Sequence, residues 1–330
     1  TTGSRNTAIG NTALYSNTTA AGNSAIGTET LYSNTTGQNN TAVGWGALYY
    51  NTTADNNTAV GSNALLTNTT GTKNTAVGHD ALEANTTANY NTAVGFEAMK
   101  ATTTGGYNVA VGTWTMDSNT TGGTNTAVGY AALEENSTGS NNCAFGVDAL
   151  KYNTTGGDNT AIGGEVGYSV TTGTNNTLIG HDAGRAASPS GNLTTHSNNV
   201  VLGDNNVANL YCADTSISSS DKRDKTDVAD FTNGLNWVNQ LKPVTYRWDK
   251  RCWYDDNTPD GSKKRNKKHI GFLAQDVLAV EGNPTDKDDM LVVNLNEDDT
   301  AYGLKYERLV PVLVNAIKEL SAKVAALEAA

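Results

Sequence analysis

A 17-residue repeat fills the first two thirds of the 330-residue chain. The unit reads N-T-A-V-G-x-x-A-L-x-x-N-T-T-G-x-x. Its first asparagine and its glycine recur at steps of 17, from Asn6 and Gly10 to Asn176 and Gly180. A looser copy ends at Gly203, after an insert that contains Pro189. Periodicity of this length is typical of stacked repeat architectures, in which each unit packs only on its neighbours.

The residue types in the unit favour strands over helices. Each unit is rich in Thr, Asn and Gly, and its apolar residues form two short clusters, which fits two short strands per coil joined by Gly and Asn turns. Coils stacked about 4.8 Å apart make a rod on the order of 55 Å long. We therefore expect a mostly β chain, a β-solenoid of 17-residue coils over residues 6–203. The valines of NTAVG would point inward, and Asn and Thr columns would hydrogen-bond from coil to coil.

The composition changes abruptly near residues 216–225, SISSSDKRDK. Residues 1–220 hold 5 Lys/Arg and 14 Asp/Glu, whereas residues 221–330 hold 17 and 19. This shift predicts a repeat rod over residues 1–205, a linker over residues 206–220 and a second domain over residues 221–330. The opening Thr1–Gly3 matches the end of a unit, so we expect a longer protein whose N-terminal region joins other components.

The second domain has a mixed α+β pattern. We expect a helix over residues 231–241, a strand over 243–248, a strand and helix over 269–277 and a terminal helix over 309–330. In the terminal helix, apolar residues recur at steps of three and four, as in a coiled coil. These residues are Val310, Leu313, Ile317, Leu320, Val324 and Leu327. The alternative is an ordinary amphipathic helix that packs on its own domain.

Charge and motif content exclude several function classes. The net charge of −11 and the pI of about 4.8 argue against nucleic-acid and anionic-membrane partners. The basic run at residues 263–269 is therefore interpreted as a solvated loop. The three cysteines, Cys143, Cys212 and Cys252, have neither disulfide-framework nor zinc spacing. No apolar run is long enough for a membrane span, and we expect no metal and no cofactor.

Both parts of the chain resemble known families. The order Asn-Thr-Ala-Val-Gly-x-x-Ala resembles the head repeats of trimeric autotransporter adhesins, which form trimers of parallel β-rolls. Four segments resemble the intramolecular chaperone of phage endosialidases and tail fibres. They are SSDKRDK (219–225), LKPVTYRW (241–248), GFLAQDV (271–277) and YGLKYERLVPVLVNAIKEL (302–320).

The second resemblance implies a chaperone that trimerises, directs folding of the fibre and then releases itself. Its Ser-Lys dyad corresponds to Ser220 as nucleophile and Lys225 as base, and the implied cut lies between Ser220 and Asp221. A neutral lysine is a competent base for a serine, but its pKa must fall by about 3 units from 10.4 through desolvation. We expect that only the assembled protein provides this burial.

The sequence thus predicts a segment of a phage tail fibre that attaches to an unidentified host receptor. It would be assembled in the host cytoplasm and carried on the virion. A homotrimer is expected, although β-branched and Leu seam residues also suit dimers. The alternatives are an uncleaved trimeric adhesin and a membrane-linked transcription factor with the same processing domain.

Overall fold

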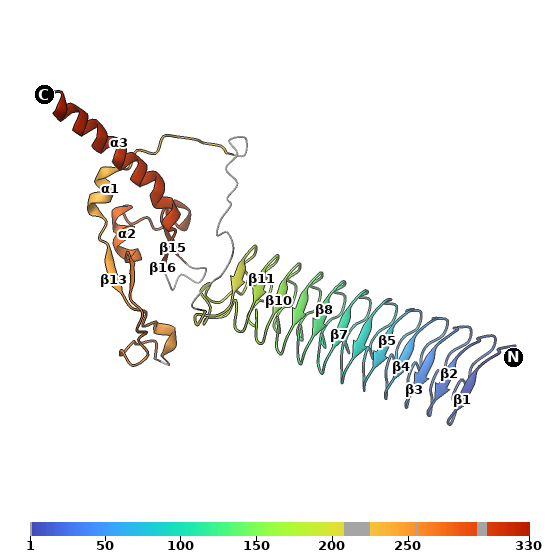
Figure 1. Cartoon of the computed structure of the whole chain (residues 1–330). Helices are drawn as coiled ribbons and strands as arrows, with labels where there is room; N and C mark the ends of the chain where they lie inside the picture. The colour runs from blue at the N-terminus through green and yellow to red at the C-terminus, as the bar shows by residue number, and fades with distance from the viewer. Residues whose placement is uncertain (1, 208–224, 255, 296–301) are drawn as a thin grey trace. The chain divides into compact units, whose positions relative to one another are not determined.

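The computed structural model describes residues 2–207, 225–254, 256–295 and 302–330. The chain divides into two compact units, Thr1–Val207 and Ala208–Ala330. The first is a stack of coils, and the second combines short helices and one long C-terminal helix with two small sheets (Figure 1). Each unit is described on its own below. Most of the linker expected at residues 206–220, together with Ser220 and Asp221, lies outside the described residues.

The first unit is a β-solenoid with one three-residue strand per coil. All twelve strands form a single parallel sheet in sequence order, and Thr92, for example, pairs with Val109 one repeat later. The expected solenoid of 17-residue coils is therefore confirmed, with a 23-residue step between the last two strands. The strands are β1 Thr7–Ile9, β2 Ser24–Ile26, β3 Thr41–Val43, β4 Thr58–Val60, β5 Thr75–Val77, β6 Thr92–Val94, β7 Val109–Val111, β8 Thr126–Val128, β9 Cys143–Phe145, β10 Thr160–Ile162, β11 Thr177–Ile179 and β12 Val200–Leu202.

The expectation of two strands per coil is wrong. We number coil positions from the first asparagine of each unit. Positions seven, nine and seventeen adopt left-handed backbone conformations, as Glu97, Met99 and Tyr107 do with φ of 54°, 53° and 62°. Such conformations are costly for residues other than glycine, and their recurrence in every coil bends the chain back on itself within one repeat. The Ala-Leu half of the unit is therefore a series of tight turns rather than a second strand.

The orientation predicted for the valines is also wrong. In the described coils the alanine at position three points inward, and Ala42, Ala59 and Ala93 are fully buried. Position four points outward and is partly exposed, as in Val77 and Ile162. The coil interior is narrow, because the leucine or methionine at position nine already fills the space beside the alanine column. Strand alternation then places Thr and Val on the outer face.

Two columns of buried asparagines satisfy the polar backbone inside the stack. At position one, Asn91 Oδ1 accepts a hydrogen bond from Asn108 N (2.9 Å), and Asn91 Nδ2 donates to the Gly105 carbonyl (2.9 Å). At position twelve, Asn68 Nδ2 donates to Asn51 Oδ1 (2.9 Å). The predicted asparagine columns are therefore confirmed, and they link each coil to the next.

The second unit is built from short elements and one long helix. Strands β13 and β14 form one antiparallel pair, and β15 and β16 form another. Its core contains Trp237, Val277, Met290, Val293 and Leu309. The elements are α1 Leu235–Gln240, β13 Val244–Tyr246, η2 Arg251–Trp253, β14 His269–Gly271, α2 Ala274–Val280, η3 Lys287–Asp289, β15 Val293–Leu295, β16 Tyr302–Leu304, η4 Tyr306–Arg308 and α3 Leu309–Glu328.

Helix α3 buries only one of its faces in its own unit. Leu309, Val312 and Ala316 are buried, and the helix packs along α1. Across the described part of the chain, no helix combines the length and the apolar composition needed to cross a membrane.

Candidate functional site

The proposed dyad is only partly within the described residues. Ser220 and Asp221 lie outside them. Lys225 is the first described residue after the predicted cut, and its side chain is exposed. The burial that the proposed dyad requires of Lys225 is therefore not present in the single chain.

The segment that follows Lys225 is fastened to helix α3. Asn315 Nδ2 donates hydrogen bonds to the carbonyl oxygens of Phe231 (2.6 Å) and Asn233 (3.3 Å). The backbone N–H of Leu235 donates to Glu319 Oε2 at 3.3 Å. Phe231 follows Lys225 closely in the sequence, so α3 anchors the chain a few residues after Lys225.

The predicted coiled-coil residues of α3 form an exposed apolar stripe. They lie on a different face of the helix from the buried Leu309, Val312 and Ala316. We call this stripe the α3 seam. Its exposed fractions are 57% for Val310, 47% for Leu313, 64% for Ile317, 52% for Leu320, 45% for Val324 and 78% for Leu327. Helix α3 therefore packs on its own unit through Leu309, Val312 and Ala316, as the amphipathic-helix alternative expects, whereas the α3 seam itself is exposed in the single chain.

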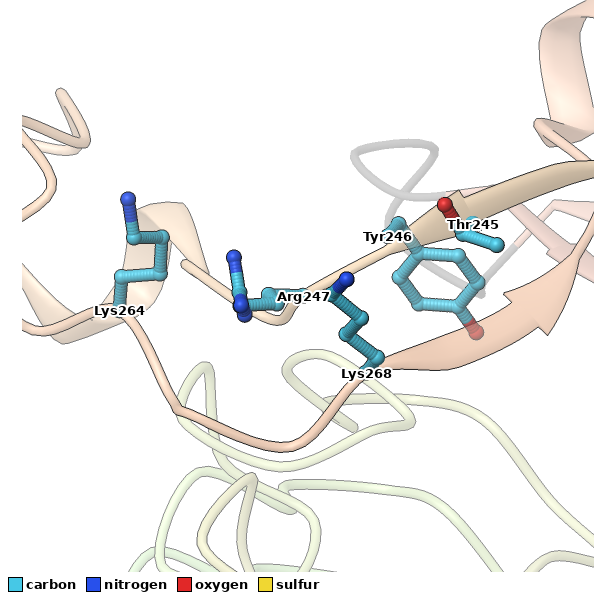
Figure 2. Close-up of a pocket in the computed structure, with 5 residues that line it drawn as sticks. All are labelled: Thr245, Tyr246, Arg247, Lys264 and Lys268. Atoms are coloured by element: carbon cyan, nitrogen blue, oxygen red, sulfur yellow. The ribbon is translucent and has the colours of Figure 1, made fainter.

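A basic hollow lies beside the β13–β14 pair. The hollow has a volume of about 220 Å³ and is lined by Arg247, Lys264, Lys268, Thr245 and Tyr246. Figure 2 shows the side chains of these five residues. Arg247 Nε donates to the Asn266 carbonyl at 3.1 Å, which ties the strand to the basic loop. The loop lysines are exposed. The hollow is thus lined by three basic side chains and by the hydroxyl-bearing Thr245 and Tyr246.

Sequence reasoning missed the groups that shape the second unit. Glu281 caps the start of β15: its carboxylate accepts hydrogen bonds from Leu291 N (3.1 Å), Val292 N (2.7 Å) and Val293 N (3.1 Å). Asn315 was also missed as an anchor. A polar residue inside the apolar helical run VLVNAI was the available signal for Asn315, whereas no local pattern marks Glu281.

Comparison with known families identifies a match for part of the C-terminal unit. Residues 220–285 match a peptidase family described as the chaperone of endosialidase. The match begins at Ser220 and includes Lys225, and it covers a fifth of the chain. No curated protein and no solved structure matches the sequence. The chain therefore carries an endosialidase-type chaperone segment C-terminal to its solenoid unit, which suggests a trimerisation chaperone like those of tail fibres.

Proposed function

We propose that this chain is a fibre segment whose C-terminal unit assembles three copies and then cuts itself off between Ser220 and Asp221. The observation that carries the proposal is the match to the endosialidase chaperone family beginning at Ser220. The exposed α3 seam supports the assembly step, because an apolar stripe of coiled-coil spacing gains stability by packing on copies of itself.

The proposed cleavage is a single serine–lysine reaction. Neutral Lys225 Nζ takes the proton of Ser220 Oγ while Oγ attacks the scissile carbonyl carbon, in its own chain or in a neighbouring one. The C–N bond to Asp221 breaks, and the new amine of Asp221 takes up the proton. Water then hydrolyses the ester, which leaves a carboxylate and the free serine. The reaction releases a C-terminal fragment that runs from Asp221 to Ala330.

Assembly would control this reaction through the environment of Lys225. In a site buried between chains, the loss of water penalises a charged group, so burial of Lys225 there would favour the neutral amine that a base requires. Helix α3 holds Phe231 and Asn233 through Asn315. Pairing of α3 helices would therefore draw the neighbouring cleavage segments together, and an unassembled chain would lack this buried site.

Near-identical coils explain why a fibre of this kind would need a chaperone. Copies displaced by one coil keep most of their local contacts, so the repeats specify the axial register poorly. A C-terminal trimer sets the register before the coils stack. Its removal takes away the refolding nucleus, and the fibre then persists because it unfolds slowly.

The cleavage proposal is tested with serine variants of the full chain. Wild-type protein should yield a C-terminal fragment that begins at Asp221, identified by intact mass. Ser220→Ala removes the attacking oxygen and should leave an uncut trimer, and Lys225→Ala should also stay uncut. Ser219→Ala is the matched control and should be cut normally. An uncut wild-type trimer would instead favour the uncleaved adhesin.

The assembly proposal is tested in the α3 seam. Ile317→Asp with Leu320→Asp would bury charge between paired helices, which is strongly unfavourable. This variant should remain monomeric and uncut. Soluble trimer of native size from it would contradict the proposal.

The same resemblance supports a proposal about where the protein is found. We propose a phage tail fibre that is assembled in the host cytoplasm and carried on the virion, where it takes part in attachment to a host surface receptor. The test is labelling of virions with antibodies against the coils.

A further inference from the structure

Helix α3 is fastened to the chain just before helix α1. Asn315 Nδ2 donates to the carbonyl oxygens of Phe231 (2.6 Å) and Asn233 (3.3 Å), and Leu235 N donates to Glu319 Oε2 (3.3 Å). Because residues four apart lie on the same face of a helix, Asn315 and Glu319 bind this stretch of chain side by side. We call these five residues and their hydrogen bonds the α3 clamp.

The clamp also brings two backbones into close contact. Gly234 is buried, and a Cβ there would lie 2.9 Å from the backbone nitrogen of Ala316 and 2.3 Å from Glu319 Oε1. A larger residue at this position would push the chain away from the helix. The Phe231 ring packs edge-on against Trp237, which belongs to the core, with ring centroids 6.0 Å apart. Polar and apolar contacts together therefore fix this stretch in one place.

The clamp and the α3 seam lie on different faces of one helix. Asn315 and Glu319 flank the buried Val312 and Ala316, whereas the seam residues are exposed. A rigid helix transmits a displacement of one face to the other. Pairing of α3 helices through the seam would therefore also fix the residues that the clamp holds.

The chain between the clamp and the proposed base is short. Phe231 is six residues after Lys225, and six residues span at most about 22 Å. Without the clamp, the next core residue is Trp237, twelve residues after Lys225, and the reach doubles to about 43 Å. The local concentration of a tethered group falls roughly as the −3/2 power of tether length, which is about a threefold loss for this doubling.

We infer that Asn315 is a positioning residue for the proposed self-cleavage, because the α3 clamp limits where Lys225 lies once the α3 helices have paired. This inference rests on the proposed function and adds to it a residue outside the Ser-Lys dyad. The Asn315 amide contacts backbone carbonyls and no reacting atom. It also explains why a polar residue interrupts the apolar run VLVNAI of α3.

The first experiment measures assembly and cleavage separately in the full chain. Asn315→Asp keeps the size of the side chain but replaces the donor with a carboxylate that repels both carbonyl oxygens, so the clamp opens. The trimer should form as in wild type, because the seam is unchanged. Cleavage within the trimer should slow at least about threefold. Pulse-labelled chains from cell-free synthesis are sampled over time, on native gels for the trimer and on denaturing gels for the fragment that begins at Asp221.

Two further variants accompany this measurement. Asn315→Gln keeps an amide donor and should recover part of the lost cleavage rate, which a change in helix stability alone would not restore. Asn239→Asp is the matched control, since it makes the same change at an exposed residue of α1. It should assemble and cut at the wild-type rate.

The second experiment opens the clamp from the opposite side. In Gly234→Ala the added Cβ overlaps α3, so this variant should also form a trimer that cuts slowly. Gly303→Ala is the control, because the nearest atom to a Cβ there is the Asn294 carbonyl oxygen at 3.8 Å. Its cleavage rate should equal that of wild type.

The outcomes separate this inference from the proposed function. Asn315→Asp trimers that cut at the wild-type rate overturn the inference alone. Loss of the trimer in both Asn315→Asp and Asn315→Gln, in step with cleavage, also overturns it, since the amide would then support the fold rather than the position of Lys225. Wild-type chains that stay uncut overturn the proposed function itself, and the inference with it.

Discussion

The two units of this chain are stabilised in opposite ways. In the solenoid, each coil hydrogen-bonds to the next through the same atoms, as Asn91 does with Asn108. In the C-terminal unit, stability depends on single long-range contacts, such as those of Asn315 with Phe231 and Glu281 with the start of β15. The solenoid is thus held by the same contacts in every coil, whatever the number of coils. The C-terminal unit is instead held by contacts that each occur once and that fix a single fold.

This difference suits the two roles in the proposed function. A repeating stack is stable once formed but cannot define where copies should align. A small unit with unique contacts and an exposed α3 seam can define alignment, but the few buried residues of its main core give it limited stability of its own. We therefore expect the same kind of substitution to have different consequences in the two units.

The largest difference is expected for glycine to alanine. Gly95 has a φ of +145°, and a Cβ there would lie 2.2 Å from the carbonyl oxygen of Gly112 in the next coil. Gly261 has a φ of +88°, but a Cβ there would meet nothing within 4 Å. Gly95→Ala should therefore cost at least about 3 kcal/mol through strain and overlap, and Gly261→Ala about 1–2 kcal/mol.

Hydrogen-exchange mass spectrometry checks this comparison on the full chain. Gly95→Ala should remove protection from β6 and β7, while Gly261→Ala should lower protection by a smaller factor and only in the second unit. Equal losses in the two variants would show that the close stacking of coils is not what requires glycine.

The next effect concerns buried polar groups in the solenoid. Asn91→Ala deprives Asn108 N and the Gly105 carbonyl of their partner, and each buried group left unpaired costs about 1–3 kcal/mol. Thr87→Ala is the control, because Thr87 lies on the preceding turn but is exposed. Exchange should accelerate around β6 and β7 only in Asn91→Ala. Normal protection there would mean that water replaces the asparagine without loss.

The corresponding test in the C-terminal unit is Glu281→Ala. Three backbone N–H groups lose a charged acceptor, which should cost about 2–4 kcal/mol. Glu307→Ala removes an exposed carboxylate of η4 and should change stability by less than about 0.5 kcal/mol. Glu281→Ala should expose β15 to exchange and slow the appearance of the C-terminal fragment, with the coils unaffected. Unchanged cleavage would separate the fold of β15 from assembly.

The sequence predicted the solenoid better than the C-terminal site, for a physical reason. Contacts between coils join residues one repeat apart, so the period itself reveals the parallel register and the asparagine columns. It could not decide whether Ala or Val of the three-residue strand points inward, because both orientations satisfy strand alternation. In the C-terminal unit, Asn315 contacts residues far away in the sequence, and no periodicity encodes such a pair. Ser220 and Lys225 came from the family resemblance, since an isolated serine and lysine carry no local signal.

The smallest expected effect on stability comes from the difference between paired and unpaired charges in the solenoid. Lys100 Nζ lies 2.7 Å from a carboxylate oxygen of Glu97, and Lys151 Nζ lies 3.1 Å from one of Asp148. Asp117 stands between these two clusters in the same column as the lysines. Among the described residues, its Oδ1 is buried without a hydrogen-bond partner. Burial, with the nearby Glu97 carboxylate, raises the pKa of Asp117 to about 6.

The sign of the pH dependence follows from this shift. The folded chain binds a proton at Asp117 more tightly than the unfolded chain, whose pKa is about 3.9. Below about pH 4, Asp117 is protonated in both states and does not lower the free energy of unfolding. As the pH rises toward and beyond 6, its ionisation lowers the free energy of unfolding progressively. Asp117→Asn should stabilise the solenoid at pH 7 by less than about 1 kcal/mol, since the half-exposed site is screened by solvent. At pH 5 the gain in stability should be smaller.

The control is Asp148→Asn, which breaks the contact with Lys151 and should instead destabilise the solenoid. Thermal midpoints of each variant and wild type at both pH values measure these differences, and a gain from Asp117→Asn that is independent of pH would refute the role of its carboxylate.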